Sequence, residues 1–214
     1  MNLMKAYSRL YERFGPQGWW PIRNEYSGKT KLSNSERFEI CVGAILTQSA
    51  SWKNVETALE SLRRNNALDK NKISRIKLNK LALTIRSSGY HNQKARKLKA
   101  FVEFLNSGKK ITRENLLDVW GVGKETADSI LLYAYNKPYF VVDAYTKRIF
   151  SRIGLIKKDA GYDEVQEFFV RNIPKNTKTY REYHALIVRH AKEYCRKKPE
   201  CDKCILNKDC KKII

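Results

Sequence analysis

Apolar residues recur every three or four positions along most of the chain, which is the period of an amphipathic α-helix. The pattern predicts a helix that begins near Trp52, a short one from Thr112 through Leu117, and others over 3–14, 33–46, 75–87, 91–107, 124–135, 144–153, 162–171 and 180–194. No alternation of apolar and polar residues with a period of two is long enough for a sheet. The sequence therefore predicts an all-α fold.

Two of these helices carry further expectations. The helix 33–46 opens with Ser33-Asn34-Ser35-Glu36, which resembles a capping box. It is so strongly apolar that we expect it at the centre of the core, with Cys41 as a buried, inert thiol. In the helix 91–107, the basic residues expected on the outer face are Lys94, Arg96, Lys97 and Lys99.

A glycine-containing turn joins two predicted helices in the stretch Val119-Trp120-Gly121-Val122-Gly123-Lys124. Backbone N–H groups at the start of a helix suit the binding of one phosphate. A short apolar run, Phe140-Val141-Val142, then ends at Asp143, which can cap the helix 144–153. Together the two segments offer a grip on a nucleic-acid backbone and a carboxylate that could act close to it.

The charge of the chain favours a polyanionic partner. Lysine and arginine number 43 against 22 acidic residues, giving a net charge of +21. Nucleic acid is the favoured partner, and the alternative is a lysine-rich, solvated surface. Apolar residues make up 42% of the chain, enough for a core, and no apolar run approaches a membrane span. The N-terminus has no apolar h-region, so we expect a cytoplasmic protein without a secretory signal.

Four of the five cysteines lie close together near the C-terminus, with the spacing Cys195-x5-Cys201-x2-Cys204-x5-Cys210. In a cytosolic chain such clustering indicates a metal site rather than disulfides. Zinc sites more often pair two Cys-x2-Cys arms, and only one short arm is present here. A [4Fe–4S] cluster is therefore favoured, with zinc as the alternative.

At this point the motifs resemble a known family. The segment from Val119 to Asp143 resembles the helix-hairpin-helix and Gly/Pro…Asp motif of the endonuclease III superfamily of DNA glycosylases. The cysteines resemble the iron–sulfur loop of that superfamily, whose first spacing is commonly x6 rather than x5. Four segments look like its 3-methyladenine DNA glycosylase III branch: Trp19-Trp20-Pro21, Ile45-Leu46-Thr47-Gln48, Gly89-Tyr90-His91-Asn92-Gln93-Lys94-Ala95 and Gly123-Lys124-Glu125. Members of that branch can lack the cluster, so this chain combines features of both groups.

The resemblance implies a two-domain helix-hairpin-helix glycosylase fold with a DNA-binding cleft between the domains. One is a six-helix domain over residues 28–137. The other is a discontinuous helical domain, residues 1–27 plus 138–214, which ends in the cluster loop 195–210.

The resemblance also implies roles for single residues. Asp143 becomes the catalytic carboxylate, where the plainer reading is a helix N-cap. The residues implied for the base pocket are Trp19, Trp20, Pro21, Trp52, Glu125 and Lys192. Those implied for DNA binding are Gln48, Gly121, Val122, Gly123, Lys124 and Thr126. Among them, Gln48 matches the residue that the family inserts into the space left by a flipped base. The alternatives are core packing for the tryptophans, a phosphate contact or solvated position for Lys192 and an exposed helix end for Gln48.

One departure from the family pattern bears on the reaction. Bifunctional members place a lysine just before Thr-Ala, and its amine forms a Schiff base with the sugar. Here that place is Glu125, and Lys124 is rotated about 100° away on the helix. We therefore expect a monofunctional DNA glycosylase of base excision repair with little or no abasic-site lyase activity.

Such an enzyme flips a damaged base out of double-stranded DNA and hydrolyses its glycosidic bond. The tryptophans favour a cationic alkylated purine such as 3-methyladenine, because a π-rich pocket attracts a cation. The alternatives are a glycosylase for uracil, mismatched thymine or an oxidised base, and a non-catalytic DNA-binding module. We expect a monomer that is associated with the nucleoid through DNA.

Overall fold

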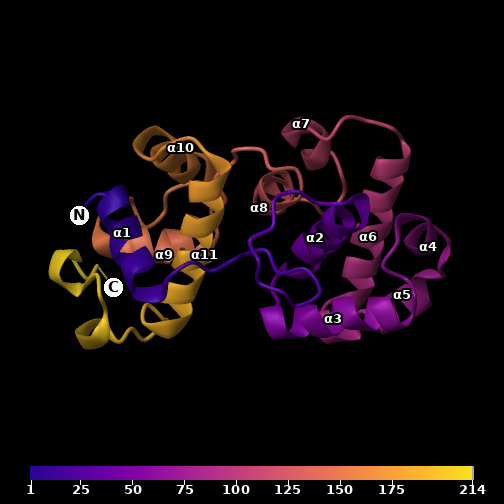
Figure 1. The fold of residues 1–214 in the computed structure, drawn as a ribbon, viewed down its shortest axis with the longest axis horizontal. Coiled ribbons are helices and arrows are strands. Elements are labelled where there is room, and N and C mark those ends of the chain that lie inside the picture. Colours follow the sequence, from indigo (N-terminus) through magenta and orange to yellow (C-terminus); the bar gives the residue numbers. More distant parts are fainter. Residues whose placement is uncertain (214) are drawn as a thin grey trace. The chain divides into compact units, whose positions relative to one another are not determined.

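The structure, a computed structural model, describes residues 1–213, which form two compact units of helices (Figure 1). The central unit is Trp20–Lys137, and the terminal unit joins Met1–Trp19 to the described part of Pro138–Ile214. Over residues 1–213 there is no strand, only an isolated antiparallel bridge between Ile22 and Glu25. The predicted all-α fold is confirmed. No helix in this part of the chain has both the length and the apolar character that crossing a membrane requires.

The central unit is built around the helix that the apolar pattern placed in the core. Its helical elements are α2 (Asn34–Leu46), α3 (Trp52–Arg64), α4 (Lys70–Arg75), α5 (Leu78–Thr84), η1 (Arg86–Ser88), α6 (His91–Asn106), α7 (Arg113–Leu117), α8 (Lys124–Ser129) and the π-helix η2 (Ile130–Ala134). Helix α2 begins at the capping box of Ser33 and Glu36 and packs against α3, α6 and η2 (Figure 1). Cys41 is 1% exposed, and burial raises the pKa of its thiol, as expected for an inert cysteine.

The terminal unit brings the two ends of the chain together. Its helical elements are α1 (Leu3–Phe14), α9 (Ala144–Ile153), α10 (Tyr162–Asn172), α11 (Thr177–Glu193), η3 (Cys201–Lys203) and η4 (Asn207–Asp209). Helix α11 packs against α1 and α9 (Figure 1). The Tyr183 hydroxyl of α11 donates a 2.7 Å hydrogen bond to the Leu3 carbonyl of α1. Phe140 stacks on Phe169 of α10 with ring centroids 4.3 Å apart. These contacts hold the extended segment that leads to Asp143 inside the core of this unit.

The expected helix 75–87 is not continuous. Ile76 and Lys77 have extended backbone angles, so they separate α4 from α5, and the 3-10 turn η1 follows. Helix α4 begins earlier than expected because the Asp69 side chain caps it, accepting from the Lys72 N–H at 3.0 Å. The expected helix 124–135 changes from α8 to the π-helix η2 at Ile130, so its end is wider than a regular α-helix.

The expectation that Lys94 lies on the outer face of α6 is wrong. Its side chain is buried, 2% exposed, and its ammonium group donates to the carbonyls of Leu46 (2.8 Å) and Ser88 (2.6 Å). These carbonyls belong to the C-terminal ends of α2 and η1, where backbone C=O groups lack partners within the helix and attract a cation. Burial lowers the pKa of Lys94 to about 8.

The first boundary between the units differs from the expected one. The sequence placed residues 20–27 with the termini, whereas the compact central unit begins at Trp20. Trp20 packs edge-on against Trp52 of α3, and the Arg23 N–H donates to the Glu39 carboxylate of α2 at 3.0 Å. These contacts attach this loop to the central unit.

Candidate functional site

The helix-hairpin-helix turn lies between α7 and α8 in the central unit. Gly121 adopts the left-handed conformation with φ of +81°, and Gly123 is the N-cap of α8 with an extended backbone. The Val122 N–H is already used, since it donates to the Val119 carbonyl at 3.0 Å. Within residues 1–213 the N–H groups of Gly121 and Gly123 have no protein acceptor. Of the three amides that the resemblance implies for DNA binding, that of Val122 is thus engaged within the turn, and those of Gly121 and Gly123 are the two without a protein acceptor in the described chain.

The turn rests on residues from two other segments. A Cβ built on Gly121 would lie 2.5 Å from Cγ of Lys97, so the lysine side chain of α6 runs directly against the turn. The Lys97 ammonium group donates to Oε1 of Gln48, and Nε2 of Gln48 donates to the Gly121 carbonyl (3.0 Å) and to the Thr126 hydroxyl (2.9 Å). Both ends of the Gln48 amide are thus bonded within the protein.

This network involves three of the residues that the resemblance implies for DNA binding: Gln48, Gly121 and Thr126. Gln48 is half-buried rather than an exposed helix end, and it would have to release the turn before its side chain could enter DNA. Thr126 is 6% exposed, so it supports the turn from inside. Lys124 is exposed at the first residue of α8, a position from which an ammonium group can meet a phosphate.

A buried ion pair below the hairpin was missed by the sequence reasoning. Asp128 of α8 is fully buried and receives two hydrogen bonds from the Arg113 guanidinium of α7, at 2.7 and 3.2 Å. The paired geometry locks the start of α7 onto α8, since a bidentate arginine fixes both distance and orientation. The signal that could have revealed it is the place of Asp128 between Ala127 and the apolar run that begins at Ile130.

The tryptophans of the central unit form an aromatic cluster with Tyr133. The Trp20 ring meets Trp52 edge-on at 5.2 Å and Tyr133 at 5.4 Å between centroids. A Cβ on Gly43 of α2 would lie 2.9 Å from the Trp20 ring, so the glycine makes room for the indole. Trp20 is 4% exposed and Pro21 is also buried, whereas Trp52 is only half-buried. The core reading fits Trp20 and Pro21, and Trp52 is the member of this cluster that retains exposed surface.

The remaining residues implied for the base pocket are distributed over both units. Glu125 is exposed in the first turn of α8. Trp19 is half-buried and Lys192 is exposed, and both belong to the terminal unit. Of the residues implied for the base pocket, the structure therefore shows Trp20 and Trp52 in contact with each other.

Asp143 is the N-cap of α9 and lies in the terminal unit. Its Oδ1 accepts from both the N–H (2.7 Å) and the hydroxyl (2.8 Å) of Thr146, which is fully buried. Its Oδ2 lies 3.6 Å from Nε2 of His184 on α11. Burial alone raises the pKa of the Asp143 carboxyl, but His184 and the bonds from Thr146 outweigh it and hold the pKa below its ordinary value. The group is therefore a carboxylate at neutral pH.

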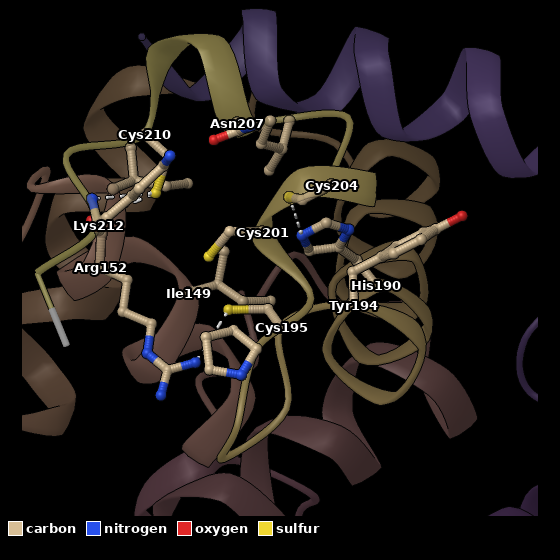
Figure 2. Close-up of a pocket in the computed structure, with 13 residues that line it drawn as sticks. Ile149, Arg152, His190, Tyr194, Cys195, Cys201, Cys204, Asn207, Cys210 and Lys212 are labelled. Atoms are coloured by element: carbon tan, nitrogen blue, oxygen red, sulfur yellow. Dashed lines mark hydrogen bonds between the residues drawn. The ribbon is translucent and has the colours of Figure 1, made fainter.

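The four clustered cysteines line one hollow in the terminal unit (Figure 2). Arg152 lies on one side of it and His190 on another, and none of the cysteines is in a disulfide. Nη1 of Arg152 is 3.4 Å from Sγ of Cys195. The Lys212 N–H donates to Sγ of Cys210, also at 3.4 Å.

The donor set suits a metal centre. Burial, together with the neighbouring thiols, raises the pKa of Cys204 and of Cys210, so four thiolates here require a positive centre to neutralise them. N–H groups aimed at sulfur are also typical partners of cluster ligands. Among residues 1–213, however, no three metal-ligating side chains converge as they would around a single ion. The residues fit a sulfur-ligated group, and its identity stays a prediction.

Comparison with known proteins agrees with the motifs. Residues 42–175 match the family model described as HhH-GPD superfamily base excision DNA repair protein. The chain is 45% identical to a putative DNA repair glycosylase, MJ1434, of Methanocaldococcus jannaschii, over 97% of this chain and 95% of that protein. It is 26% identical to endonuclease III of Sulfolobus acidocaldarius, over 97% and 94% of the two chains.

Solved structures show the same fold. The 3-methyladenine DNA glycosylase MagIII of H. pylori, bound to 1,N6-ethenoadenine, superimposes with a TM-score of 0.74 at 30% identity, covering 90% of this chain and 98% of that one. An endonuclease III–DNA complex gives a TM-score of 0.82 at 20% identity, over 98% and 94% of the chains. The resemblance to the endonuclease III superfamily is confirmed, while the iron–sulfur loop stays a prediction. The chain therefore belongs to the HhH-GPD superfamily of base excision DNA repair proteins, as a DNA repair glycosylase.

Proposed function

We propose that the protein is a monofunctional DNA glycosylase that excises alkylated purines such as 3-methyladenine from double-stranded DNA. The observation that carries the proposal is Asp143, a carboxylate with an 11% exposed side chain whose surroundings keep it ionised. When the bond between C1′ and the purine breaks, its electron pair leaves with the base and positive charge develops on the sugar. A fixed carboxylate stabilises that charge, and water then adds to C1′ and releases a proton.

Two observations support alkylated purines as the substrate class. A purine nucleotide that is alkylated on a ring nitrogen such as N3 carries a positive charge, leaves as a neutral base, and needs no strong general acid. Aromatic faces and a carboxylate favour such a cation, and Trp52 and Glu125 have the exposure that a ligand contact requires. The similarity to the H. pylori enzyme, whose structure contains a modified adenine, points to the same class.

The absence of lyase activity is proposed from Glu125. This side chain occupies the place where bifunctional relatives supply an amine, and a carboxylate cannot form an imine. Borohydride should therefore trap no covalent complex between the wild-type protein and abasic DNA. The variant Glu125→Lys serves as a matched probe because it introduces an amine at this position. A wild-type adduct as abundant as that of a bifunctional endonuclease III would contradict the proposal.

DNA binding is proposed to use the helix-hairpin-helix turn and the basic surface. The free amides of Gly121 and Gly123 and the exposed Lys124 suit a phosphate, and the net charge of +21 favours duplex DNA without sequence preference. Binding should weaken steeply with salt. The same affinity for damaged and undamaged duplexes, without base release, would indicate a DNA-binding module instead.

The decisive experiment measures base release. The purified protein is incubated with methylated DNA, and with duplexes that each carry 1,N6-ethenoadenine, uracil, mismatched thymine or 8-oxoguanine. Free bases are then separated chromatographically. We expect release of methylated purines, with the single-turnover rate of Asp143→Asn reduced roughly 10²–10³-fold. Asparagine keeps Oδ1 as an acceptor for Thr146, so the fold and DNA affinity should be retained. Normal turnover by the variant would remove Asp143 from the mechanism.

The cysteine hollow is proposed to hold a [4Fe–4S] cluster through Cys195, Cys201, Cys204 and Cys210. When bound, the cluster would link the last segment of the chain to α11 and to Arg152 of α9. Protein purified without oxygen should be brown and contain roughly four iron and four sulfide per chain. Stoichiometric zinc without sulfide would select the alternative.

A further inference from the structure

The two oxygens of Asp143 are not equivalent. Both hydrogen bonds from Thr146 go to Oδ1, so the donors of α9 leave Oδ2 unbonded to that helix. The side chain that faces Oδ2 is His184, whose Nε2 lies 3.6 Å away. Each of the two facing side chains is 11% exposed, so water screens the contact little. Oδ2 is therefore the oxygen whose position α9 does not fix, and it faces an imidazole.

The distance is informative by itself. At 3.6 Å the contact is longer than a hydrogen bond, and it is too short for a bridging water. A displacement of about half an ångström would bring the two atoms to hydrogen-bond distance. A buried imidazole N–H at this place attracts the ionised form of the carboxyl and opposes its neutral form.

The contact with His184 becomes more important to the ionisation of Asp143 when a nucleotide enters the site. A sugar placed against Asp143 excludes water from the carboxylate, and desolvation raises the pKa of a carboxyl group. A neutral carboxylic acid would stabilise an oxocarbenium-like sugar far less than a carboxylate. An imidazole that keeps the Asp143 carboxylate ionised therefore helps the reaction without touching the substrate.

We propose that His184 is the positioning residue of the catalytic centre: it fixes Oδ2 of Asp143 and keeps the carboxylate ionised while the damaged nucleotide is bound. The proposal rests on the proposed function, because it requires Asp143 to act on the sugar. The groups that face the carboxylate are Thr146 from α9 and His184 from α11. From α10, the Tyr162 hydroxyl accepts from the Val142 N–H at 3.4 Å and so fixes the preceding backbone. Of these, His184 is the titratable group in contact with the carboxylate.

A matched pair of variants separates positioning from packing. Glutamine and methionine have nearly the same shape, but only glutamine carries an N–H near the place of Nε2. His184→Met should therefore lose the positioning effect and His184→Gln should retain most of it. If His184 serves only to fill the space between α9 and α11, the two variants should behave alike.

The test uses the full-length, metal-replete protein and the lesion duplex that the wild type processes. Single-turnover rates are measured from pH 5 to 9 with enzyme in excess, together with the dissociation constant for DNA. Loss of the imidazole raises the pKa of Asp143, so the acid limb of the profile should move to higher pH in His184→Met. At a fixed pH on that limb, the rate should fall about tenfold when the pKa of Asp143 rises by about one. DNA affinity should stay within about twofold, and His184→Gln should recover most of the rate.

The outcomes are distinguishable. A wild-type profile for His184→Met, or equal losses in both variants, would overturn the positioning role while leaving the glycosylase assignment intact. No base release by the wild type on any substrate would instead refute the proposed function. The carboxyl titration of Asp143, followed by carbon-13 NMR in the DNA-free protein, gives a readout that does not need activity. We expect a higher pKa in His184→Met than in the wild type, and an unchanged pKa would refute the contact.

Discussion

Replacing Gly121 by alanine tests how the helix-hairpin-helix turn is supported. At φ of +81° an alanine is strained, which costs about 1–2 kcal/mol. Its Cβ would also lie 2.5 Å from Cγ of Lys97, which is the inner part of that side chain, with Cδ and Cε at 2.7 and 2.8 Å. Lys97 must then move, and its hydrogen bond to Gln48 is lost. A bond to a charged group contributes about 1.5–3 kcal/mol, so the total loss of stability should be roughly 2.5–5 kcal/mol.

The measurement is the free energy of unfolding of Gly121→Ala from urea titrations followed by circular dichroism. Gly123→Ala is the matched control, since Gly123 has an extended backbone and a Cβ there meets nothing within 4 Å. Its loss should stay below about 1 kcal/mol. In a Lys97→Ala background the clash is absent, so Gly121→Ala should cost only the strain, about 1–2 kcal/mol.

Two results would refute this reasoning. Equal losses for the two glycine variants would mean that the left-handed backbone and the Lys97 contact do not determine the turn. A cost of Gly121→Ala that is unchanged when Lys97 is already alanine would show that the lysine yields freely and that backbone strain alone acts.

Three further predictions concern the central unit. Gly43→Ala should displace Trp20 and destabilise the protein by about 1–3 kcal/mol, which calorimetry and tryptophan fluorescence would detect; unchanged fluorescence would contradict the close packing. The pKa of Lys94 is lowered to about 8, so between about pH 8 and 10.5 the unfolded chain binds more protons than the folded one. The free energy of unfolding of the wild type, measured by urea titration, should therefore rise over this pH range relative to that of Lys94→Met. The absence of such a rise would show that the ammonium group is solvated. Arg113→Leu leaves the Asp128 carboxylate buried without its guanidinium partner, so the free energy of unfolding should fall by about 3–5 kcal/mol in the same assay. A fall below about 1 kcal/mol would show that other groups are enough to stabilise the carboxylate.

Much of the site could be read from local patterns. The Gly-Val-Gly turn, the capping aspartate and the grouped cysteines are short-range features, and the structure places Asp143 at an N-cap and the four cysteines around one hollow. The apolar period located nearly every helix. The break between α4 and α5 was not predicted because neither Ile76 nor Lys77 is a glycine or proline, so no local residue indicates their extended backbone.

Partnerships between distant segments could not be read in this way. Lys94 looked like one of four solvated basic residues, and its burial depends on the ends of α2 and η1 meeting α6. The resemblance implied that Gln48 enters DNA, with an exposed helix end as the alternative, and the structure shows its amide bonded to Lys97, Gly121 and Thr126. His184 carried no motif at all. In each case the residue type is compatible with several roles, and the contacts with residues distant in sequence determine which role applies.

The sequence by itself determined the helical class, the hairpin, the capping aspartate and the cysteine group, because periodicity, glycine spacing and side-chain capping act within a few residues. Only the tertiary structure decided which polar groups are buried and what they bond. Burial and pKa depend on the surfaces that packing brings together, and those surfaces come from parts of the chain far apart in sequence. One consequence is the contact of Asp143 with His184, which joins α9 to α11 and on which our proposal about the reaction rests.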